Sequence, residues 1–557
     1  MKTKPSKSRS PGKARPAEPS SNFEPVGPSY LRNAWISSAI VLIVSAVLLF
    51  AQLGHYALWD DEAVVGLAAK GVLQTGDTTV RLGDNLVAYR GGILVRDLHE
   101  RSTPPLATYF AAGSIGLLGG NSLAARLPFA LAGLGCVALC LAWALKERVR
   151  LTTLWLLGGA IVGNVSFFLY SRQCRYYALV LLLSTAVAWL YLRWKCSRGQ
   201  LVLLSGLMGL LFAANYMSYL ALLVCILADF VGWRRKEAKF APADWVALAV
   251  PQLILGLGVA SIWNPLSTKF GGYVAQNDLW DRMVLFWWNL RDMNRCEFFV
   301  GALLLAAPVV AVVRKDRWLT RALVAMGLYV MVISAVSPQT MNNTTVADIR
   351  YLIALLPLGW VISVRTLEGI TGKARATALA LAVVAFGTNL LHGGPMLSWG
   401  IRSTPVSFAG ELIHPPTDPY TVAASWINEN VREGESIWVE PDYMPYSLMF
   451  HAPKAIYAWQ LTPPPQGQFA SMPSIHFMGL VAPDYVMAFG PVVQQVSEML
   501  KQWNRASYQP VATLDAFWQD RYRPELFLRS FEPVKNFNRQ TESIFVLKRT
   551  GSMKANP

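Results

Sequence analysis

The chain has 557 residues, of which 53% are apolar, and its mean hydropathy is +0.33. This composition excludes an ordinary soluble enzyme, because a soluble fold cannot cover so much apolar surface. The net charge of +16 does not indicate a nucleic-acid partner, since the Lys and Arg residues form short clusters between apolar runs, as the positive-inside rule describes. We therefore expect a polytopic α-helical protein that contacts membrane lipids and no nucleic acid.

The N-terminal tail sets the expected orientation. Residues 1–33 are rich in Pro, Ser, Lys and Arg and hold almost nothing to bury, which predicts a disordered cytoplasmic tail. The apolar run at 34–53 has no small-residue cleavage site at its end, so we expect an uncleaved anchor. With the basic tail inside, residues 54–121 form a first outer loop.

Later apolar runs alternate with basic clusters through residue 395. The run at 106–118 follows a Pro-Pro pair and is short for a crossing, so we expect a helix that lies in the membrane interface. With that run excluded, every basic cluster falls inside and about eleven crossings result. The expected crossings are 34–53, 122–145, 151–170, 176–192, two within 201–233 on either side of a polar break at 215–218, 245–263, 298–313, 318–336, 351–364 and 376–391.

The composition changes after residue 395. Residues 396–557 are mixed polar and contain no apolar run long enough to span a membrane. Patterns of strands and amphipathic helices predict a small α/β domain here, outside the membrane, beside a transmembrane catalytic domain at 34–395. The expected strands are Ser436–Glu440, Tyr485–Phe489 and Ser543–Leu547, and the expected helices are Val422–Arg432 and Val492–Trp503.

Three consecutive acids, Asp60, Asp61 and Glu62, follow the first span. Acids beside a membrane surface lose solvation, so a chain that keeps them there usually uses them. The alternative is structural, because Asp and Glu also favour the first turn of a helix, where they complement the helix dipole. The triplet alone leaves both interpretations open, and a catalytic carboxylate becomes the stronger one if other polar groups converge on the same side.

Cations and aromatic residues on the outer side supply that convergence. An arginine at an outer span end runs against the positive-inside trend and binds phosphate in bidentate geometry. Taken singly, each residue also fits an interface anchor, a surface histidine or an aromatic belt. Arg172 and Arg175 are three apart, so we expect them on one helix face. The candidate substrate-binding residues are His99, Arg101, Arg126, Arg172, Arg175, Tyr176 and Arg350.

Five short motifs occur in a fixed order, and none is specific by itself. They are Trp59–Ala63, Thr103–Leu106, Ala125–Pro128, Arg172–Leu179 and Arg350–Leu352. Together they resemble the GT-C fold glycosyltransferases related to protein O-mannosyltransferases and to the aminoarabinose transferases of lipid A, over roughly residues 35–365. The chain departs from the aminoarabinose transferases at Thr103, where those enzymes carry a Lys directly before Pro-Pro-Leu.

The resemblance implies a glycosyltransferase of the bacterial-type cell (inner) membrane that uses a polyprenyl-phosphate-linked sugar on the extracytoplasmic side. It assigns the general base to Asp61, with Glu62 beside it, and gives Arg126 and Arg175 a role in binding donor phosphate or organising the site. We expect an inverting displacement in which the base takes a proton from the acceptor hydroxyl. The sugar, the acceptor (glycan, lipid or protein) and the choice between Asp60 and Asp61 stay open.

No cofactor is required by the sequence. A divalent cation between Asp61, Glu62 and the phosphate is compatible with these residues, but no spacing demands one. No Cys or His cluster indicates zinc. Of the six cysteines, only Cys174 and Cys296 are expected to face outward, where a bridge between them is one option.

Other functions predict other patterns. A transporter or flippase of an anionic lipid or glycan needs ionisable or helix-breaking residues deep within spans and an internal repeat, whereas these spans are largely clean. A sensory membrane protein leaves the outward arginines without a role. Among enzymes, the alternative donor is a lipid-diphosphate-linked oligosaccharide; a nucleotide sugar does not suit an outward site, because nucleotide sugars are cytoplasmic.

Overall fold

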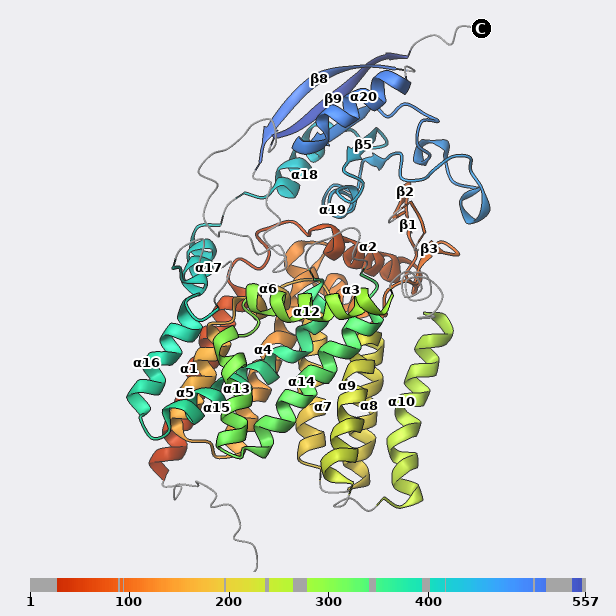
Figure 1. Ribbon diagram of the computed structural model, residues 1–557. Coiled ribbons are helices and arrows are strands. Elements are labelled where there is room, and N and C mark those ends of the chain that lie inside the picture. The colour runs from red at the N-terminus through yellow and green to blue at the C-terminus, as the bar shows by residue number, and fades with distance from the viewer. Residues whose placement is uncertain are drawn as a thin grey trace, which may run out of the picture.

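The computed structural model describes residues 28–552 apart from 89–90, 94, 195–196, 236–239, 264–277, 340–346, 393–400, 416, 504–505 and 517–542. It consists of a helical bundle with a sheet region over one end (Figure 1). Most of the tail expected at 1–33 lies outside the described residues. Helix α1 begins at Pro28, before the predicted boundary at residue 34, and proline suits this place because it has no backbone N–H to leave unsatisfied in a first turn.

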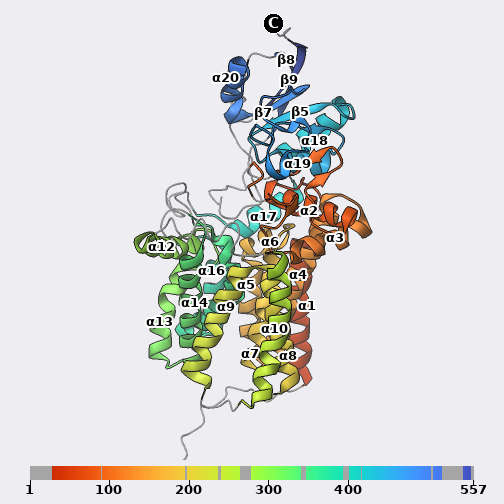
Figure 2. The same ribbon diagram turned by 90° about the vertical axis from the view of Figure 1, so that its right-hand side faces the viewer.

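The bundle helices run side by side along its long axis (Figures 1 and 2). Apolar runs form them because, with no water to bind the backbone, a membrane segment must satisfy its own hydrogen bonds. They are α1 (Pro28–Phe50), α4 (Ser122–Lys146), α5 (Leu151–Val162), α7 (Tyr177–Leu192), α8 (Arg198–Ala214), α9 (Tyr216–Asp229) with η1 (Phe230–Arg234), α10 (Pro242–Ile262), α13 (Gly301–Val313), α14 (Arg317–Val336), η2 (Ile349–Leu355) with α15 (Leu356–Thr371), and α16 (Arg375–Gly387).

The described residues contain six helices long and apolar enough to cross a membrane, or seven if the bent pair α5 and α6 counts as one. Further apolar helices, among them α7, α8, α13 and α16, are shorter. The chain is therefore a polytopic helical membrane protein, while the count of about eleven crossings stays a prediction.

Two polar positions divide the bundle helices. Asn215 ends α8 and caps α9, because its side chain accepts a hydrogen bond from the Ser218 N–H at 2.8 Å. The polar break expected at 215–218 is therefore confirmed. The crossing expected at 151–170 is bent and stays a prediction: α5 ends at Val162, and α6 (Val165–Ser171) continues at an angle of 58°. Asn164 starts α6 by accepting from the Phe167 N–H at 2.9 Å.

A layer of shorter elements lies between the bundle and the sheet (Figure 1). It contains α2 (Asp60–Thr75), α3 (Leu106–Leu118), α6 and α12 (Leu279–Arg295). Helix α3 has the bounds expected for the interfacial segment. Two short antiparallel pairs lie between α2 and α3, in the segment expected to be the first outer loop: β1 (Arg81–Leu82) with β2 (Asn85–Leu86) and β3 (Val95–Arg96) with β4 (His99–Glu100).

The C-terminal region is built on a five-stranded sheet in the order β6-β5-β7-β9-β8. Strand β5 is parallel to β6 and β7, and β9 is antiparallel to β7 and β8. The strands are β5 (Ser436–Glu440), β6 (Ile456–Tyr457), β7 (Tyr485–Phe489), β8 (Ala506–Asp515) and β9 (Ser543–Ser552). The helices are α17 (Thr404–Ile413), α18 (Pro419–Asn430), α19 (Pro445–His451) and α20 (Val493–Trp503), with single turns η4 (Gly467–Phe469), η5 (Ser474–His476) and η6 (Gly490–Val492).

The expected secondary structure of this region is present. All three predicted strands form, as do the two predicted helices, α18 and α20, within a few residues of the predicted bounds. Strand β8 was not expected, because its residues are half exposed at the edge of the sheet and lack a continuous apolar pattern.

The sheet region rests on the start of α2. Gly66 of α2 leaves room for the ring of Phe450 in α19, since a Cβ at residue 66 would lie 2.9 Å from that ring. Asn85 of the first outer loop accepts from the Tyr457 N–H at 2.8 Å and donates to the Ala455 carbonyl at 2.8 Å. These contacts tie the C-terminal region to the loop that carries the three acids.

Candidate active site

The three acids occupy the first turn of α2, which begins at Asp60. The exposed N–H groups of a first turn favour negative charge, so the sequence pattern and the helix start agree. Successive helical residues point about 100° apart, so neighbouring acids face different surroundings. Asp60 turns back to the backbone and accepts from the Asp61 N–H.

Glu62 forms a closed ion pair with Arg126 of α4. The Glu62 side chain is 0% exposed and that of Arg126 is 2% exposed. The guanidinium donates through Nε to Oε1 at 2.9 Å and through Nη2 to Oε2 at 2.6 Å, a bidentate pair. The same carboxylate accepts from the Cys174 N–H at 2.7 Å and the Trp59 N–H at 3.3 Å.

The remaining donors of Arg126 hold the chain that leads into α2. Nη1 donates to the carbonyls of Tyr56 at 2.8 Å and Leu53 at 3.2 Å, and Nη2 donates to that of Ala57 at 2.9 Å. Every nitrogen of this guanidinium therefore has a protein acceptor. The geometry fits the site-organising role among the two roles that the resemblance implied for Arg126.

Asp61 lies in a different network, between Arg175 and Arg350. Both guanidiniums approach the same oxygen, Oδ2, at 3.2 Å from Arg175 Nη2 and 2.8 Å from Arg350 Nη1. Arg175 also donates to the Asp61 carbonyl at 2.9 Å, and Arg350 donates to Asp348 at 2.9 Å. The structure thus brings together three residues that are distant in sequence and that the motifs singled out.

This second network retains donors that the protein does not use. The Nε atoms of Arg175 and Arg350 are buried and have no hydrogen-bond partner among the described residues. Burial by itself lowers the pKa of the Arg175 guanidinium, but the Asp61 carboxylate, Tyr177 and Tyr176 together more than offset this, and the net shift is upward. Buried donors that keep their charge and lack an acceptor are unusual, and an anionic ligand is one way to satisfy them.

Arg172 contacts the end of α1. Its Nη1 donates to the carbonyls of Leu48 (2.9 Å), Leu49 (3.1 Å) and Ala51 (2.7 Å), which lie at the C-terminal end of α1. The helix face expected to hold both Arg172 and Arg175 is absent from the described residues, because α6 ends at Ser171 and α7 begins at Tyr177. The non-helical turn between them sends the two arginines to different partners.

His99 and Arg101 contact Asp77 of the first outer loop instead of the acid triplet. Arg101 donates to both Asp77 oxygens, at 2.7 and 2.6 Å, and His99 Nε2 lies 3.5 Å from Oδ2. The hydrogen bonds from Arg101 lower the pKa of Asp77 to about 2. Asp77 shares no motif with Arg101, so the sequence offered no signal for this pair.

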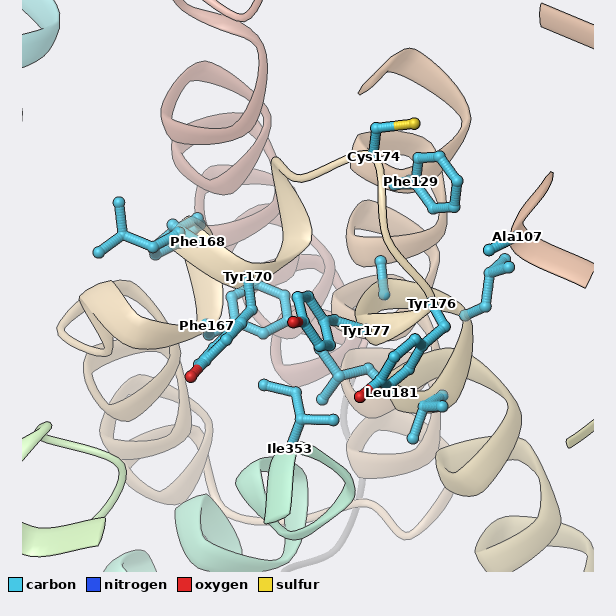
Figure 3. Close-up of a cluster of buried hydrophobic side chains, with 14 of the residues drawn as sticks. Ala107, Phe129, Phe167, Phe168, Tyr170, Cys174, Tyr176, Tyr177, Leu181 and Ile353 are labelled. Atoms are coloured by element: carbon cyan, nitrogen blue, oxygen red, sulfur yellow. The ribbon is translucent and has the colours of Figure 1, made fainter. Parts of the chain in front are cut away.

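Tyr176 belongs to an aromatic cluster beside Arg175. Tyr176 and Tyr177 pack edge to face with centroids 4.6 Å apart, and Tyr177 does the same with Tyr170 at 4.8 Å (Figure 3). The guanidinium of Arg175 lies 5.7 Å from the Tyr176 ring. Figure 3 also shows Ile353, which follows Arg350 in η2, approaching the same cluster. The cluster fixes the turn that presents Arg175.

Among the described residues, neither the cysteines nor metal-ligating side chains form a further candidate site. Cys174 and Cys296 are both buried and are not joined by a disulfide. Within the described residues, no group of three or more His, Cys, Asp and Glu side chains is arranged to hold a metal ion. Arg175 and Arg350, which contact the Asp61 carboxylate, repel a cation.

Comparison with known proteins identifies the fold. No family model and no curated protein sequence matches the chain. Among solved structures, ArnT from Cupriavidus metallidurans bound to undecaprenyl phosphate matches with a TM-score of 0.52 and 14% identity, over 92% of this chain and 97% of that one. The same protein in the apo state matches with a TM-score of 0.50 and 13% identity, over 93% and 98%. The GT-C fold that the motifs indicated is therefore confirmed.

Proposed function

We propose that this GT-C-fold membrane protein is a glycosyltransferase that moves a sugar from a polyprenyl-phosphate donor to an acceptor on the extracytoplasmic side. The observation that carries the proposal is the position of the Asp61 carboxylate, 3.2 Å from Arg175 and 2.8 Å from Arg350. A carboxylate can take a proton and two guanidiniums can hold a phosphate, so both chemical needs of the reaction meet at one point.

The comparison supports the donor class. The ArnT structure with the same fold was solved with undecaprenyl phosphate, a polyprenyl phosphate. In this chain, the two unused Nε donors of Arg175 and Arg350 give such a phosphate hydrogen bonds that the protein leaves open. An outer position for the site follows from the basic tail that precedes α1, together with about eleven crossings.

In the proposed reaction, the acceptor hydroxyl loses its proton to Asp61 while its oxygen bonds to the anomeric carbon. The bond between that carbon and the phosphate oxygen breaks on the opposite face, and the electron pair leaves with the polyprenyl phosphate, so the configuration is inverted. Arg175 and Arg350 stabilise the charge that gathers on the leaving phosphate. The aromatic cluster around Tyr176 holds Arg175 in place for this task.

The other candidates receive supporting roles in this proposal. Glu62 and Arg126 fix the start of α2, because their hydrogen bonds go to each other and to the backbone. Arg172 holds the end of α1 against the turn that carries Arg175. Asp60 shapes the first turn of α2 through the Asp61 N–H. His99 and Arg101 stabilise the outer loop through Asp77.

A transfer assay in proteoliposomes tests the proposal. The purified protein is given a panel of radiolabelled donors: polyprenyl-phosphate hexoses and pentoses, a lipid-diphosphate-linked oligosaccharide and nucleotide sugars, with a mixed lipid, glycan and protein extract as acceptor. We expect label to leave one polyprenyl-phosphate sugar only, with inversion at the anomeric carbon of the product. Consumption of the diphosphate oligosaccharide alone, or retention of configuration, contradicts the proposal.

A further inference from the structure

The chain segment that enters the candidate active site, residues 56–58, is held by side chains from the C-terminal region. The Ala57 N–H donates to Asp418 Oδ2 and to Thr421 Oγ1, both at 3.2 Å. The Leu58 N–H donates to His451 Nε2 at 3.0 Å. These acceptors come from the start of α18 and the end of α19, more than 350 residues further along the chain.

The opposite side of the same segment is held by the bundle. The carbonyls of Tyr56 and Ala57 accept from Arg126, as described above. Ala57 and Leu58 are buried, so water does not replace either set of partners. Two residues later comes Asp60, and then Asp61. Residues 56–58 therefore lie between the membrane bundle and the C-terminal region. The bundle provides one set of their hydrogen bonds, and the C-terminal region provides the other.

His451 can accept from Leu58 only as a neutral imidazole, with its proton on Nδ1. Its surroundings favour that form: burial, Arg126 and Lys70 lower its pKa to about 3. Lys70 of α2 in turn donates to the Phe450 carbonyl at 2.8 Å, which binds the residue before His451 at the end of α19 to α2. Asp418 is also fixed, because it accepts from the Tyr420 and Thr421 N–H groups at the start of α18.

We propose that His451, Asp418 and Thr421 are positioning residues of the active centre, which hold the backbone of Ala57 and Leu58 and thereby place the Asp61 carboxylate between Arg175 and Arg350. The effect on turnover rests on the proposed function. That these residues hold the segment rests on the hydrogen bonds alone. The C-terminal region then contributes positioning residues to the catalytic site. A displacement of a catalytic group by about 1 Å costs on the order of 100-fold in rate, so loss of these contacts acts on turnover.

The first test measures amide hydrogen exchange, which does not require activity. In His451→Ala, the Leu58 N–H loses its acceptor, and we expect exchange in peptides covering residues 54–62 to rise by about tenfold, as for a locally opened segment. His451→Gln keeps an acceptor oxygen and is expected to exchange like the wild type. His414→Ala, which removes an exposed histidine after α17, is the matched control and is expected to change nothing at 54–62.

The second test measures turnover of the polyprenyl-phosphate sugar by the same variants. We expect kcat of His451→Ala to fall by about 10- to 100-fold with KM for the donor unchanged, and kcat of His451→Gln to recover, because the donor-binding arginines are not touched. Thr421→Val removes one of the two acceptors of the Ala57 N–H without changing side-chain size. It is expected to lower kcat by only a few-fold, and it replaces His451→Ala in both tests if that variant does not fold.

Unchanged exchange at 54–62 in His451→Ala overturns the assignment, and so does a rise in donor KM at constant kcat. If the wild type consumes no polyprenyl-phosphate sugar, the proposed function fails, while the exchange result still decides whether His451 holds the segment.

Discussion

Asp61 and Glu62 are neighbours in one helical turn, yet their surroundings are opposite. Glu62 is fully buried, and its carboxylate is matched by Arg126 and two backbone N–H groups. The Asp61 side chain keeps 12% exposure, and its partners Arg175 and Arg350 each retain a buried Nε without an acceptor among the described residues. A closed ion pair fixes structure, whereas a pair with unused donors can exchange partners with a ligand.

The difference between Asp61 and Glu62 predicts the largest loss of activity for Asp61→Asn. Removing the proton acceptor is expected to lower kcat by about 10³-fold, or about 4 kcal/mol in the barrier, because general-base catalysis contributes on this scale. The thermal midpoint in detergent is expected to change little. Asp60→Asn is the matched control, since its side chain can still accept from the Asp61 N–H, and it is expected to keep activity within a few-fold. If the two variants exchange these outcomes, the base is Asp60.

The closed pair predicts a loss of stability instead. Arg126→Met leaves Glu62 buried without a counter-charge, which costs about 3 kcal/mol or more of the free energy of unfolding. The double variant Glu62→Met with Arg126→Met removes both charges and is expected to recover part of that loss, although the carbonyls of residues 53, 56 and 57 stay without their donor. Denaturation in detergent measures both. A stable Arg126→Met variant that binds donor weakly contradicts the structural assignment.

The contact of Asp61 with Arg175 and Arg350 predicts a change in donor binding. Arg350→Lys keeps the charge but loses the fork of donors that approaches both Asp61 and Asp348. We expect KM for the polyprenyl-phosphate donor to rise about tenfold, with a smaller fall in kcat. Arg172→Lys, at an arginine that donates to three carbonyls at the end of α1, serves as control. Equal donor KM in Arg350→Lys and the wild type argues against phosphate binding at Arg350.

The smallest effect is expected for Arg101→Ala. Its partner Asp77 is more than a third exposed, so the pair contributes under about 1 kcal/mol and activity changes less than about twofold. Because the pKa of Asp77 is lowered to about 2, this contribution is present above pH 4 and is lost as the pH falls towards 2. The difference in thermal midpoint between wild type and variant is therefore expected to shrink over that range. A large loss of donor binding in Arg101→Ala would show that Arg101 contributes to the donor site.

Local patterns determined much of the architecture. The apolar runs, the break at Asn215, a short helix at 106–118 and three strands of the sheet are all present. Each depends on properties of adjacent residues: the length of an apolar run, a capping side chain, the alternation of a strand. The bend between α5 and α6 was missed, because Asn164 lies within an otherwise apolar run whose length fits one crossing.

The residues of the candidate site also divide into those that local patterns predicted and those that only tertiary structure placed. The sequence placed Asp61, Arg175 and Arg350 among its candidates, since their motifs occur in order at span ends. Only the tertiary structure decided that Arg126 pairs with Glu62, that Arg172 donates to carbonyls at the end of α1 and that Arg101 pairs with Asp77. It also brought in His451 and Asp418, for which the sequence offered no signal. The physical reason is distance along the chain: Glu62 and Arg126 are 64 residues apart, Asp61 and Arg350 are 289, and Leu58 and His451 are 393. Which of several arginines meets a given carboxylate depends on how distant segments pack, and no local pattern records that choice.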